Sequence, residues 1–286
     1  MQFTSVPDFL TNGLHHLGAG PVALLFAEDA TEINSTLRHH LGQNFRAVIL
    51  FGPAELAVST ELQQQIIWIT TGPRRKGERT EAVNALIDPL AGRWIYVGHN
   101  AEYLYFPFCE TRTIGDVTRF IEEERRASAF AYVIDLYPTD LDRAPDGVSL
   151  IDAHLDQSGY FAHTRRRGDQ VMERQLDIYG GLRWRFEEHV PQSSRRIDRV
   201  ALFKAKRGVR LRDDFTLTDE EMNTYTCPWH HSVTVAVCSF RAAKALRTNP
   251  GSSEAVTDFA WHNSVRFNWH SRQLLELGLM ESGQWF

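Results

Sequence analysis

Carboxylate side chains occur at or near the ends of several apolar runs in this sequence. Glu28 and Asp29 follow the run Val22–Ala27, Glu102 comes soon after another run, and Asp135 lies near the end of a third. Carboxylates can take a proton as general bases and can accept hydrogen bonds from ligand hydroxyl groups. Each of these residues also has a structural explanation. Glu28 or Asp29 could cap a helix, Asp135 could make a structural hydrogen bond, and Glu102 could form an ion pair. These residues are therefore candidates for a functional role, and a structural role stays open for each.

Strands and helices alternate through roughly the first hundred residues. Short apolar runs of the kind buried on both faces of a sheet alternate with segments whose apolar residues recur at helical spacing. We predict strands at residues 22–27, 47–51, 66–69 and 94–97, and helices at 32–41, 55–65 and 79–90. Asp29 or Thr31 is placed to cap the first of these helices. This alternation predicts an α/β fold with a mostly parallel central sheet between helices, a three-layer α/β/α arrangement.

The carboxyl ends of the predicted strands mark a candidate ligand site. In open parallel sheets the ligand crevice lies just beyond these strand ends. Here the strand ends correspond to residues 27–29, 51–53, 70–72 and 98–102. We therefore expect side chains from these four segments to line one cleft.

The second half of the chain is less regular. We predict a charged helix at 117–126, a strand at 131–137, a loop at 165–169, a buried segment at 233–246 and a short helix at 273–278. No internal repeat or low-complexity tract marks a boundary. The sequence thus predicts one domain over residues 1–286.

Composition limits the classes of partner. A net charge of −5 and a pI near 6.2 give no reason to expect nucleic acid or an acidic membrane as partner. Short basic runs, such as those at 74–76 and 165–167, fit solvated loops or contacts with an anionic ligand. No signal peptide or transmembrane run of about 20 apolar residues is visible. The cysteines Cys109, Cys227 and Cys238 suit free thiols, so we expect a cytoplasmic protein.

Histidines suggest no metal site of their own. Cys227, His230 and His231 lie close together, but a zinc site needs four ligands and no second pair stands nearby. His39 and His40 are expected at the surface. The glycine-rich fingerprint of dinucleotide-binding enzymes, the P-loop and the nucleophile elbow are all absent. Dehydrogenase, kinase-like and hydrolase classes are therefore disfavoured.

Several short motifs follow one another in a recognisable order. They are Phe26-Ala27-Glu28-Asp29, the segments Arg79–Asn84 and Trp94–Val97, His99-Asn100-Ala101-Glu102-Tyr103-Leu104 before Pro107, Ile134-Asp135-Leu136-Tyr137-Pro138, Gly180-Gly181-Leu182-Arg183-Trp184-Arg185-Phe186, Arg199-Val200-Ala201-Leu202 and Val237-Cys238-Ser239-Phe240-Arg241. In this order, over roughly residues 20–245, the chain resembles glycosyltransferases of the GT-A fold, in particular the large inverting family two.

The resemblance implies roles for individual residues. Donor-binding residues would be Glu28, Asp29, Arg79, Asn84, Asn100, Arg183 and Arg185, and catalytic residues would be Asp135 and Glu102. Asp135 would act as general base on an acceptor hydroxyl. Rivals for that role are Asp152, Asp156, Glu187 and Glu188.

The chain departs from the family at the metal-binding motif. Family members carry an Asp-x-Asp motif whose carboxylates hold Mn²⁺ or Mg²⁺ against the donor diphosphate, whereas His99 and Ala101 stand at the matching positions here. Three alternatives follow. Glu102 holds the metal weakly, or Arg183 and Arg185 take over its charge, or donor binding has been lost.

The resemblance implies a hexosyltransferase-type enzyme of polysaccharide biosynthesis. It would transfer a sugar from a nucleotide-sugar donor to a hydroxyl of a saccharide or other acceptor, with inversion. Residues 20–107 would form the nucleotide-binding half, 108–245 the acceptor half and 246–286 a C-terminal extension. The first alternative is a catalytically inactive relative that binds a glycan or a protein, and a weaker one is an α/β enzyme of another class.

Overall fold

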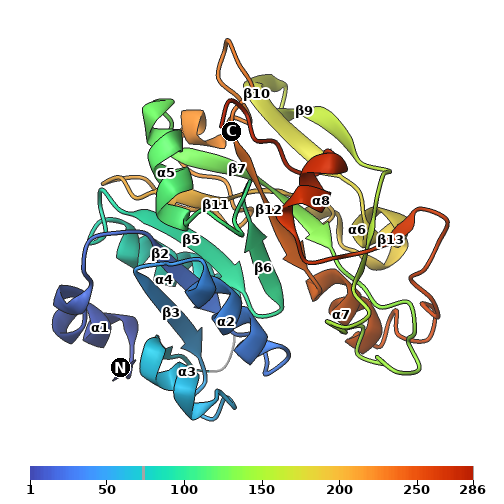
Figure 1. Cartoon of the computed structure of the whole chain (residues 1–286), viewed down its shortest axis with the longest axis horizontal. Coiled ribbons are helices and arrows are strands. Elements are labelled where there is room, and N and C mark those ends of the chain that lie inside the picture. Colours follow the sequence, from blue (N-terminus) through green and yellow to red (C-terminus); the bar gives the residue numbers. More distant parts are fainter. Residues whose placement is uncertain (73–74, 286) are drawn as a thin grey trace. The chain divides into compact units, whose positions relative to one another are not determined.

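The computed structural model describes residues 1–72 and 75–285, which form two compact units (Figure 1). Unit 1 consists of residues 1–103, 111–130 and 200–223, and unit 2 of residues 104–110, 131–199 and the described residues after Asn223. None of the described helices is long and apolar enough to cross a membrane.

Unit 1 contains most of the predicted α/β alternation. Its elements are β1 (Gln2–Phe3), α1 (Val6–Asn12), β2 (Val22–Phe26), α2 (Ile33–Gly42), β3 (Ala47–Gly52), α3 (Thr60–Gln65), β4 (Ile67–Thr70), α4 (Glu78–Ile87), β5 (Trp94–His99), α5 (Ile114–Glu123) and most of β11 (Asp198–Lys204). The strands lie in the order β1-β4-β3-β2-β5-β11. Neighbours from β1 to β5 are parallel, and only the β11–β5 pair among these is antiparallel. The predicted α/β fold with a mostly parallel sheet is therefore confirmed.

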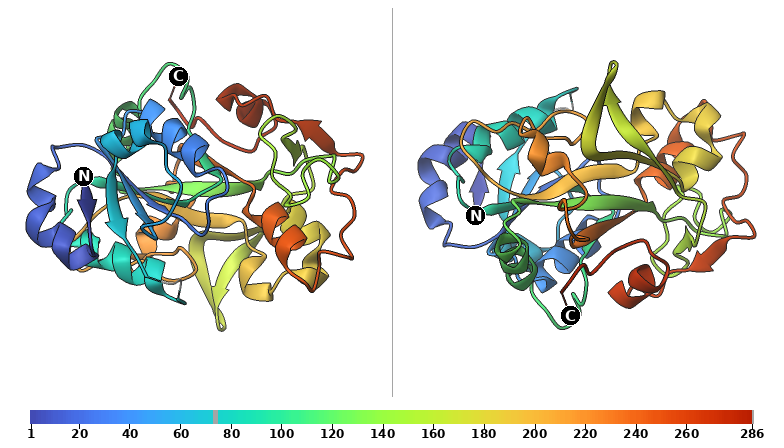
Figure 2. Two further views of the ribbon diagram at one scale, coloured as in Figure 1. Left: turned by 90° about the horizontal axis from the view of Figure 1, so that it is seen from below. Right: turned by 90° about the horizontal axis from the view of Figure 1, so that it is seen from above.

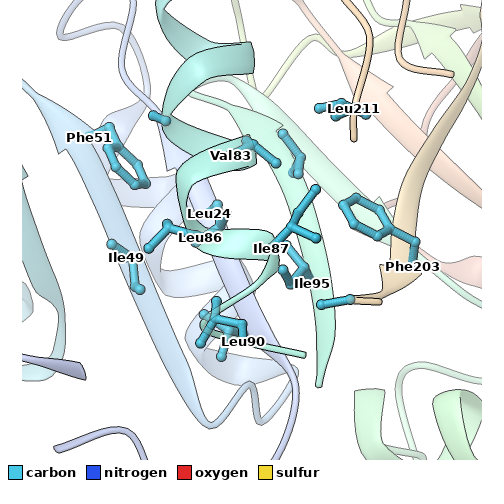
Figure 3. Packing of buried hydrophobic residues seen from close by; sticks show 14 of the residues in the cluster. Leu24, Ile49, Phe51, Val83, Leu86, Ile87, Leu90, Ile95, Phe203 and Leu211 are labelled. Atoms are coloured by element: carbon cyan, nitrogen blue, oxygen red, sulfur yellow. The ribbon is translucent and has the colours of Figure 1, made fainter. Parts of the chain in front are cut away.

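Helices cover both faces of this sheet. On one face, Leu86 and Ile87 of α4 pack over Leu24 and Ile95 of the central strands (Figure 3). On the other face, α2 lies over Tyr96, which follows Ile95 and so points the opposite way. Both views in Figure 2 show α2 and α4 on opposite sides of the strands. Unit 1 thus has the three layers expected from the sequence.

Some local predictions were wrong in unit 1. Helix α2 has Glu32 as its N-cap, with a φ of 51° and no side-chain cap bond, so neither Asp29 nor Thr31 caps it. The helix predicted over 55–65 is confined to α3. The segment before residue 20 also contributes a strand, β1, which pairs with β4 although the two are far apart in sequence.

Unit 2 contains shorter strands and helices. Its elements include the ends of β6 (Glu102–Tyr105) and β7 (Ser128–Asp135), then β8 (His154–Asp156), β9 (Phe161–Arg167), β10 (Gln170–Tyr179), α6 (Leu182–Arg185), β12 (Thr234–Ser239), α7 (Arg241–Thr248), β13 (Ser264–Arg266) and α8 (Ser271–Glu276). Strand β12 lies between β7 and β6, whereas β9 pairs with β10 and β8 with β13 in two separate antiparallel sheets.

The basic run predicted to be a loop at 165–169 is instead part of the β9–β10 hairpin. Arg165 is buried, and its Nε donates to Asp177 at 2.7 Å, while its Nη2 pairs with Asp198. Arg166 and Arg167 are exposed. The one buried arginine of this run is therefore paired with two aspartates, of which Asp177 lies in the same hairpin and buried Asp198 lies further along the chain.

Candidate functional site

A cleft of 960 Å³ lies at the carboxyl ends of the parallel strands in unit 1. The ends of β2, β3, β4 and β5 contribute Glu28, Phe51, Thr71 and His99 to its lining, and the start of α4 contributes Arg79. This confirms the expectation that the four strand ends meet at one cleft. It is the position at which open α/β sheets bind ligands.

Two aromatic rings form an apolar part of this cleft. Phe26 and Phe51 both line it, and their rings are stacked with centroids 4.5 Å apart and an interplanar angle of 9°. They come from paired positions on the neighbouring strands β2 and β3. The parallel register therefore places them side by side on the same face of the sheet.

Three cationic residues, Arg75, Lys76 and Arg79, line the cleft where α4 begins, and we call them the basic edge. The Arg79 guanidinium lies 3.9 Å from the centroid of the Phe215 ring and donates to the carbonyl oxygen of Asp213 at 2.8 Å. Stacking and this hydrogen bond hold the side chain against the wall. A guanidinium group is suited to bind an oxyanion.

Acidic residues line the cleft as well. Glu28 and Glu55 follow β2 and β3, whereas Glu78 and Asp213 lie beside the basic edge. Carboxylates accept hydrogen bonds from hydroxyl groups, while the basic edge suits phosphate. The lining is thus suited to a ligand that carries hydroxyl groups, phosphate and an apolar ring.

The turn after β5 holds the loop that follows β2. The Asn100 side-chain oxygen accepts from the Glu28 amide at 2.8 Å, and its Nδ2 donates to Asp29 Oδ1 and to the Thr31 carbonyl, each at 2.8 Å. Asn100 is completely buried. We call this set of contacts the Asn100 latch. It fixes the edge of the cleft that Glu28 lines.

Glu102 does not line the cleft. Its side chain is completely buried and accepts from the His99 backbone amide at 2.9 Å, with the His99 ring nitrogen Nδ1 at 3.3 Å. The backbone turns sharply before it, since Ala101 has a φ of 56° and its amide donates to Thr36 Oγ1. The sequence predicted a Glu102 that faces the ligand space, and the sharp turn directs it into the protein instead.

The residues at this turn do not fit a divalent cation. Mn²⁺ or Mg²⁺ would need several oxygen ligands directed at one point. The Asn100 oxygen and Asp29 Oδ1 are used in the latch, and the Glu102 carboxylate points into the interior. Across residues 1–72 and 75–285 no three His, Cys, Asp or Glu side chains are grouped to hold a metal.

Other residues predicted to bind the donor have structural partners. Asn84 donates through Nδ2 to the Leu211 carbonyl at 3.0 Å and accepts from the Leu211 amide at 2.7 Å, so it holds the segment that carries Asp213. Arg79 and Glu28 line the cleft, whereas Asp29 belongs to the latch. Arg75 and Lys76 were predicted from the sequence only as part of a basic run. Their position between a strand end and a predicted helix could have indicated that they line the cleft.

Asp135 lies in unit 2 in an ion pair. Arg183 Nε lies 3.2 Å from Asp135 Oδ1, and the Arg183 amide donates to Oδ2 at 3.3 Å. Burial raises the pKa of Asp135, and Arg183 opposes this rise. Gly181 has a φ of 63°, and a Cβ there would come within 3.0 Å of Asp135 Oδ2, so glycine permits this close approach.

Arg185 is held by a second buried aspartate in unit 2. Its Nε lies 3.2 Å from Asp156 Oδ2, and its guanidinium lies over the Trp261 ring. The Tyr137 hydroxyl and the Trp261 indole N–H both donate to Asp156 Oδ1. Burial raises the pKa of Asp156, against the effects of Arg185 and Tyr137. Arg183 and Arg185 are thus each committed to a buried carboxylate.

The other residues considered from the sequence are placed as follows. Asp152 accepts from the Thr139 amide, Glu187 pairs with Arg195, and Glu188 lies 3.7 Å from His189. His40, expected at the surface, is completely buried, and its ring stacks on Tyr96 with centroids 5.0 Å apart. The surface prediction was wrong because the helical spacing of α2 puts His40 on the same buried face as Ile33 and Leu37.

Comparison with known proteins gives only distant likenesses. No family model matches the sequence, and no curated protein matches it. Among solved structures, a glucose-1-phosphate thymidylyltransferase from Bacillus anthracis in complex with sucrose is 7% identical, with 66% of this chain and 72% of that chain covered and a TM-score of 0.30. A UDP-glucose pyrophosphorylase from Acinetobacter baumanii is 9% identical, with 83% and 97% covered and a TM-score of 0.35. The function is therefore inferred from the cleft itself.

Proposed function

We propose that this chain is a glycosyltransferase-like protein that binds a nucleotide-sugar in the cleft of unit 1 and transfers the sugar, with inversion, to a hydroxyl group of a saccharide or other acceptor. One observation carries the proposal. The carboxyl ends of β2 to β5 and the start of α4 together line a single cleft with apolar, acidic and cationic parts. The order of motifs that resembles GT-A enzymes of family two supports the same assignment.

Each part of the lining suits one part of such a donor. The paired rings of Phe26 and Phe51 offer an apolar contact for a nucleobase. Glu28, held by the latch, can accept hydrogen bonds from ribose or sugar hydroxyl groups. The basic edge can neutralise the diphosphate, whose charge grows as the bond to the sugar breaks.

A second candidate function is binding without transfer. Inverting transfer needs a carboxylate that takes the acceptor proton, and Asp135 is the residue that the family resemblance assigns. Its carboxylate is buried and paired with Arg183. This observation favours a catalytically inactive relative that binds a nucleotide-sugar or glycan.

Thermal unfolding with a panel of nucleotide-sugars tests the proposal. UDP-, GDP-, CDP-, ADP- and dTDP-sugars are each added to the purified chain, and a ligand at about 100 times its Kd should stabilise it by about 2.7 kcal/mol. Glu28→Gln and Arg79→Gln should lose most of this stabilisation. Arg119→Gln, an exposed position on α5 that does not line the cleft, is the matched control. The proposal is wrong if no nucleotide-sugar in the panel stabilises the chain.

Turnover separates the two candidate functions. Each stabilising donor is incubated with mono- and oligosaccharide acceptors, and release of the nucleoside diphosphate is followed. Release that depends on acceptor supports transfer. Stabilisation without release over long incubation supports the inactive relative.

A further inference from the structure

We propose that the cleft binds the diphosphate of its nucleotide without a divalent cation, through the basic edge formed by Arg75, Lys76 and Arg79. This inference rests on the proposed function, because it concerns the same cleft. The sequence suggested two other sources of positive charge for the diphosphate, a weakly bound metal at Glu102 or the arginines Arg183 and Arg185. We assign this role to the basic edge instead.

The Asn100 latch uses the groups that a metal would need. The Asn100 oxygen already accepts from the Glu28 amide at 2.8 Å, which leaves it at most one lone pair for a cation. Asp29 Oδ1 already accepts from Asn100 and from the Thr31 amide, at 2.8 and 2.9 Å. A metal bound here would therefore compete with the contacts that shape the edge of the cleft.

The carboxylate of Glu102 has a structural role at the same turn. It is completely buried and accepts from the His99 amide, so it ties the end of β5 to the start of β6. Turning it toward the cleft would leave a buried backbone N–H without this acceptor, which costs about 1–3 kcal/mol.

The basic edge supplies positive charge inside the cleft. Arg79 is held by Phe215 and by the Asp213 carbonyl, so it is oriented before a ligand arrives. Arg75 makes an exposed ion pair with Glu81 through both of its terminal nitrogens, so a ligand phosphate would compete with the Glu81 carboxylate for it. Guanidinium and ammonium groups can neutralise a diphosphate without any metal.

Two acidic residues beside the basic edge are engaged locally. Asp213 Oδ1 accepts from the Thr80 hydroxyl at 2.6 Å, and Glu78 Oε2 accepts from the Arg75 amide at 3.4 Å. Gly77, the N-cap residue of α4, also lines the cleft, and no side chain caps this helix.

The arginines of unit 2 cannot supply this charge without breaking buried pairs. Arg183 is bound to Asp135, and Arg185 is bound to Asp156 and donates to the Phe259 carbonyl at 2.8 Å. Removing one partner from a buried pair costs about 3–5 kcal/mol.

Calorimetric titration with UDP, GDP, CDP and ADP tests the inference. Each nucleotide is titrated into the full chain in excess EDTA and again in a saturating excess of MnCl₂ or MgCl₂. For the nucleotide that binds, we expect Kd values in EDTA and in metal to agree within about twofold, which is under 0.5 kcal/mol. Arg79→Gln should weaken binding in EDTA by about tenfold or more, and Arg79→Lys should retain part of it.

Controls separate this inference from the proposed function. Arg119→Gln should bind like the unsubstituted chain, and the melting temperature of each variant without nucleotide shows whether it is folded. Binding that becomes about tenfold or more tighter with metal overturns the metal-free inference and leaves the proposed function standing. Absence of binding with every nucleotide, with and without metal, overturns the proposed function and this inference with it.

Discussion

At the scale of single residues, Asn100 makes contacts that differ from those of a metal ligand. Its side-chain amide accepts one hydrogen bond from the loop after β2 and donates two to it, and the residue is completely buried. A carboxylate at this position could accept from the Glu28 amide but could not donate to the Thr31 carbonyl. Asn100 is therefore a structural residue of this turn, which holds the loop after β2 in place.

Replacement of Asn100 by alanine is expected to destabilise the chain. Loss of three hydrogen bonds, each with a net contribution of about 0.5–1.5 kcal/mol, should lower the free energy of unfolding by about 2–4 kcal/mol in urea titration. Asn12→Ala, on the exposed side of α1, should change it by less than about 0.5 kcal/mol. Equal effects of the two substitutions would contradict the role given to the latch.

Asp135 provides the second prediction at this scale. Asp135→Ala leaves the Arg183 guanidinium without its buried partner and should lower the free energy of unfolding by about 3–5 kcal/mol. The double variant Asp135→Ala/Arg183→Met should recover part of this loss, because the uncompensated charge is gone. A variant Asp135→Asn that keeps full stability but loses transfer would instead support the role of general base.

At the scale of elements, the contact between α2 and β5 makes stability depend on pH. His40 of α2 is buried on Tyr96 of β5, and burial lowers its pKa from 6.5 to about 3, with a smaller contribution from His39. The Thr36 carbonyl and Glu102 oppose this shift. The folded chain therefore keeps His40 neutral at pH values where the unfolded chain protonates it.

Above about pH 6.5 His40 is neutral in both the folded and the unfolded chain, so its titration does not affect stability. As the pH falls from 6.5 toward 3, only the unfolded chain protonates it, and the free energy of unfolding should decrease by up to about 1.4 kcal/mol per pH unit. His40→Phe keeps a ring on Tyr96 without a titrating group, so its stability should fall less steeply between pH 6.5 and 4.5. The measurement is urea unfolding at several pH values. Parallel curves for the two proteins would contradict the assignment.

The sequence was informative about elements whose pattern is local. The buried runs of β2 and β3 and the polar residues at their ends predicted the sheet and the position of the cleft. The hairpin of β9 and β10 was missed because β9 is almost entirely exposed and so lacks the apolar alternation that predicts a strand. The inward direction of Glu102 depends on the positive φ of Ala101, which residue type alone does not predict.

At the scale of the whole molecule, nucleotide binding should affect the chain unevenly. The proposed ligand contacts segments 26–28, 53–55, 70–72 and 75–80, all in unit 1. Hydrogen exchange with and without the binding nucleotide should therefore show added protection in peptides that cover these segments. Peptides from β9 and β10 in unit 2 should change little. Protection confined to unit 2 would contradict the placement of the site.

The antiparallel pairing of β5 with β11 has a consequence for synthesis of the chain. Leu202 pairs with Tyr96, so one edge of β5 has no partner until about a hundred further residues have been translated. At about 5–20 residues per second a ribosome needs roughly 5–20 s for this interval. During that time an apolar strand edge is exposed to other nascent chains, a state that chaperones recognise. Fragments that stop before Asp198 should thus sediment as aggregates on refolding, whereas the full chain should not.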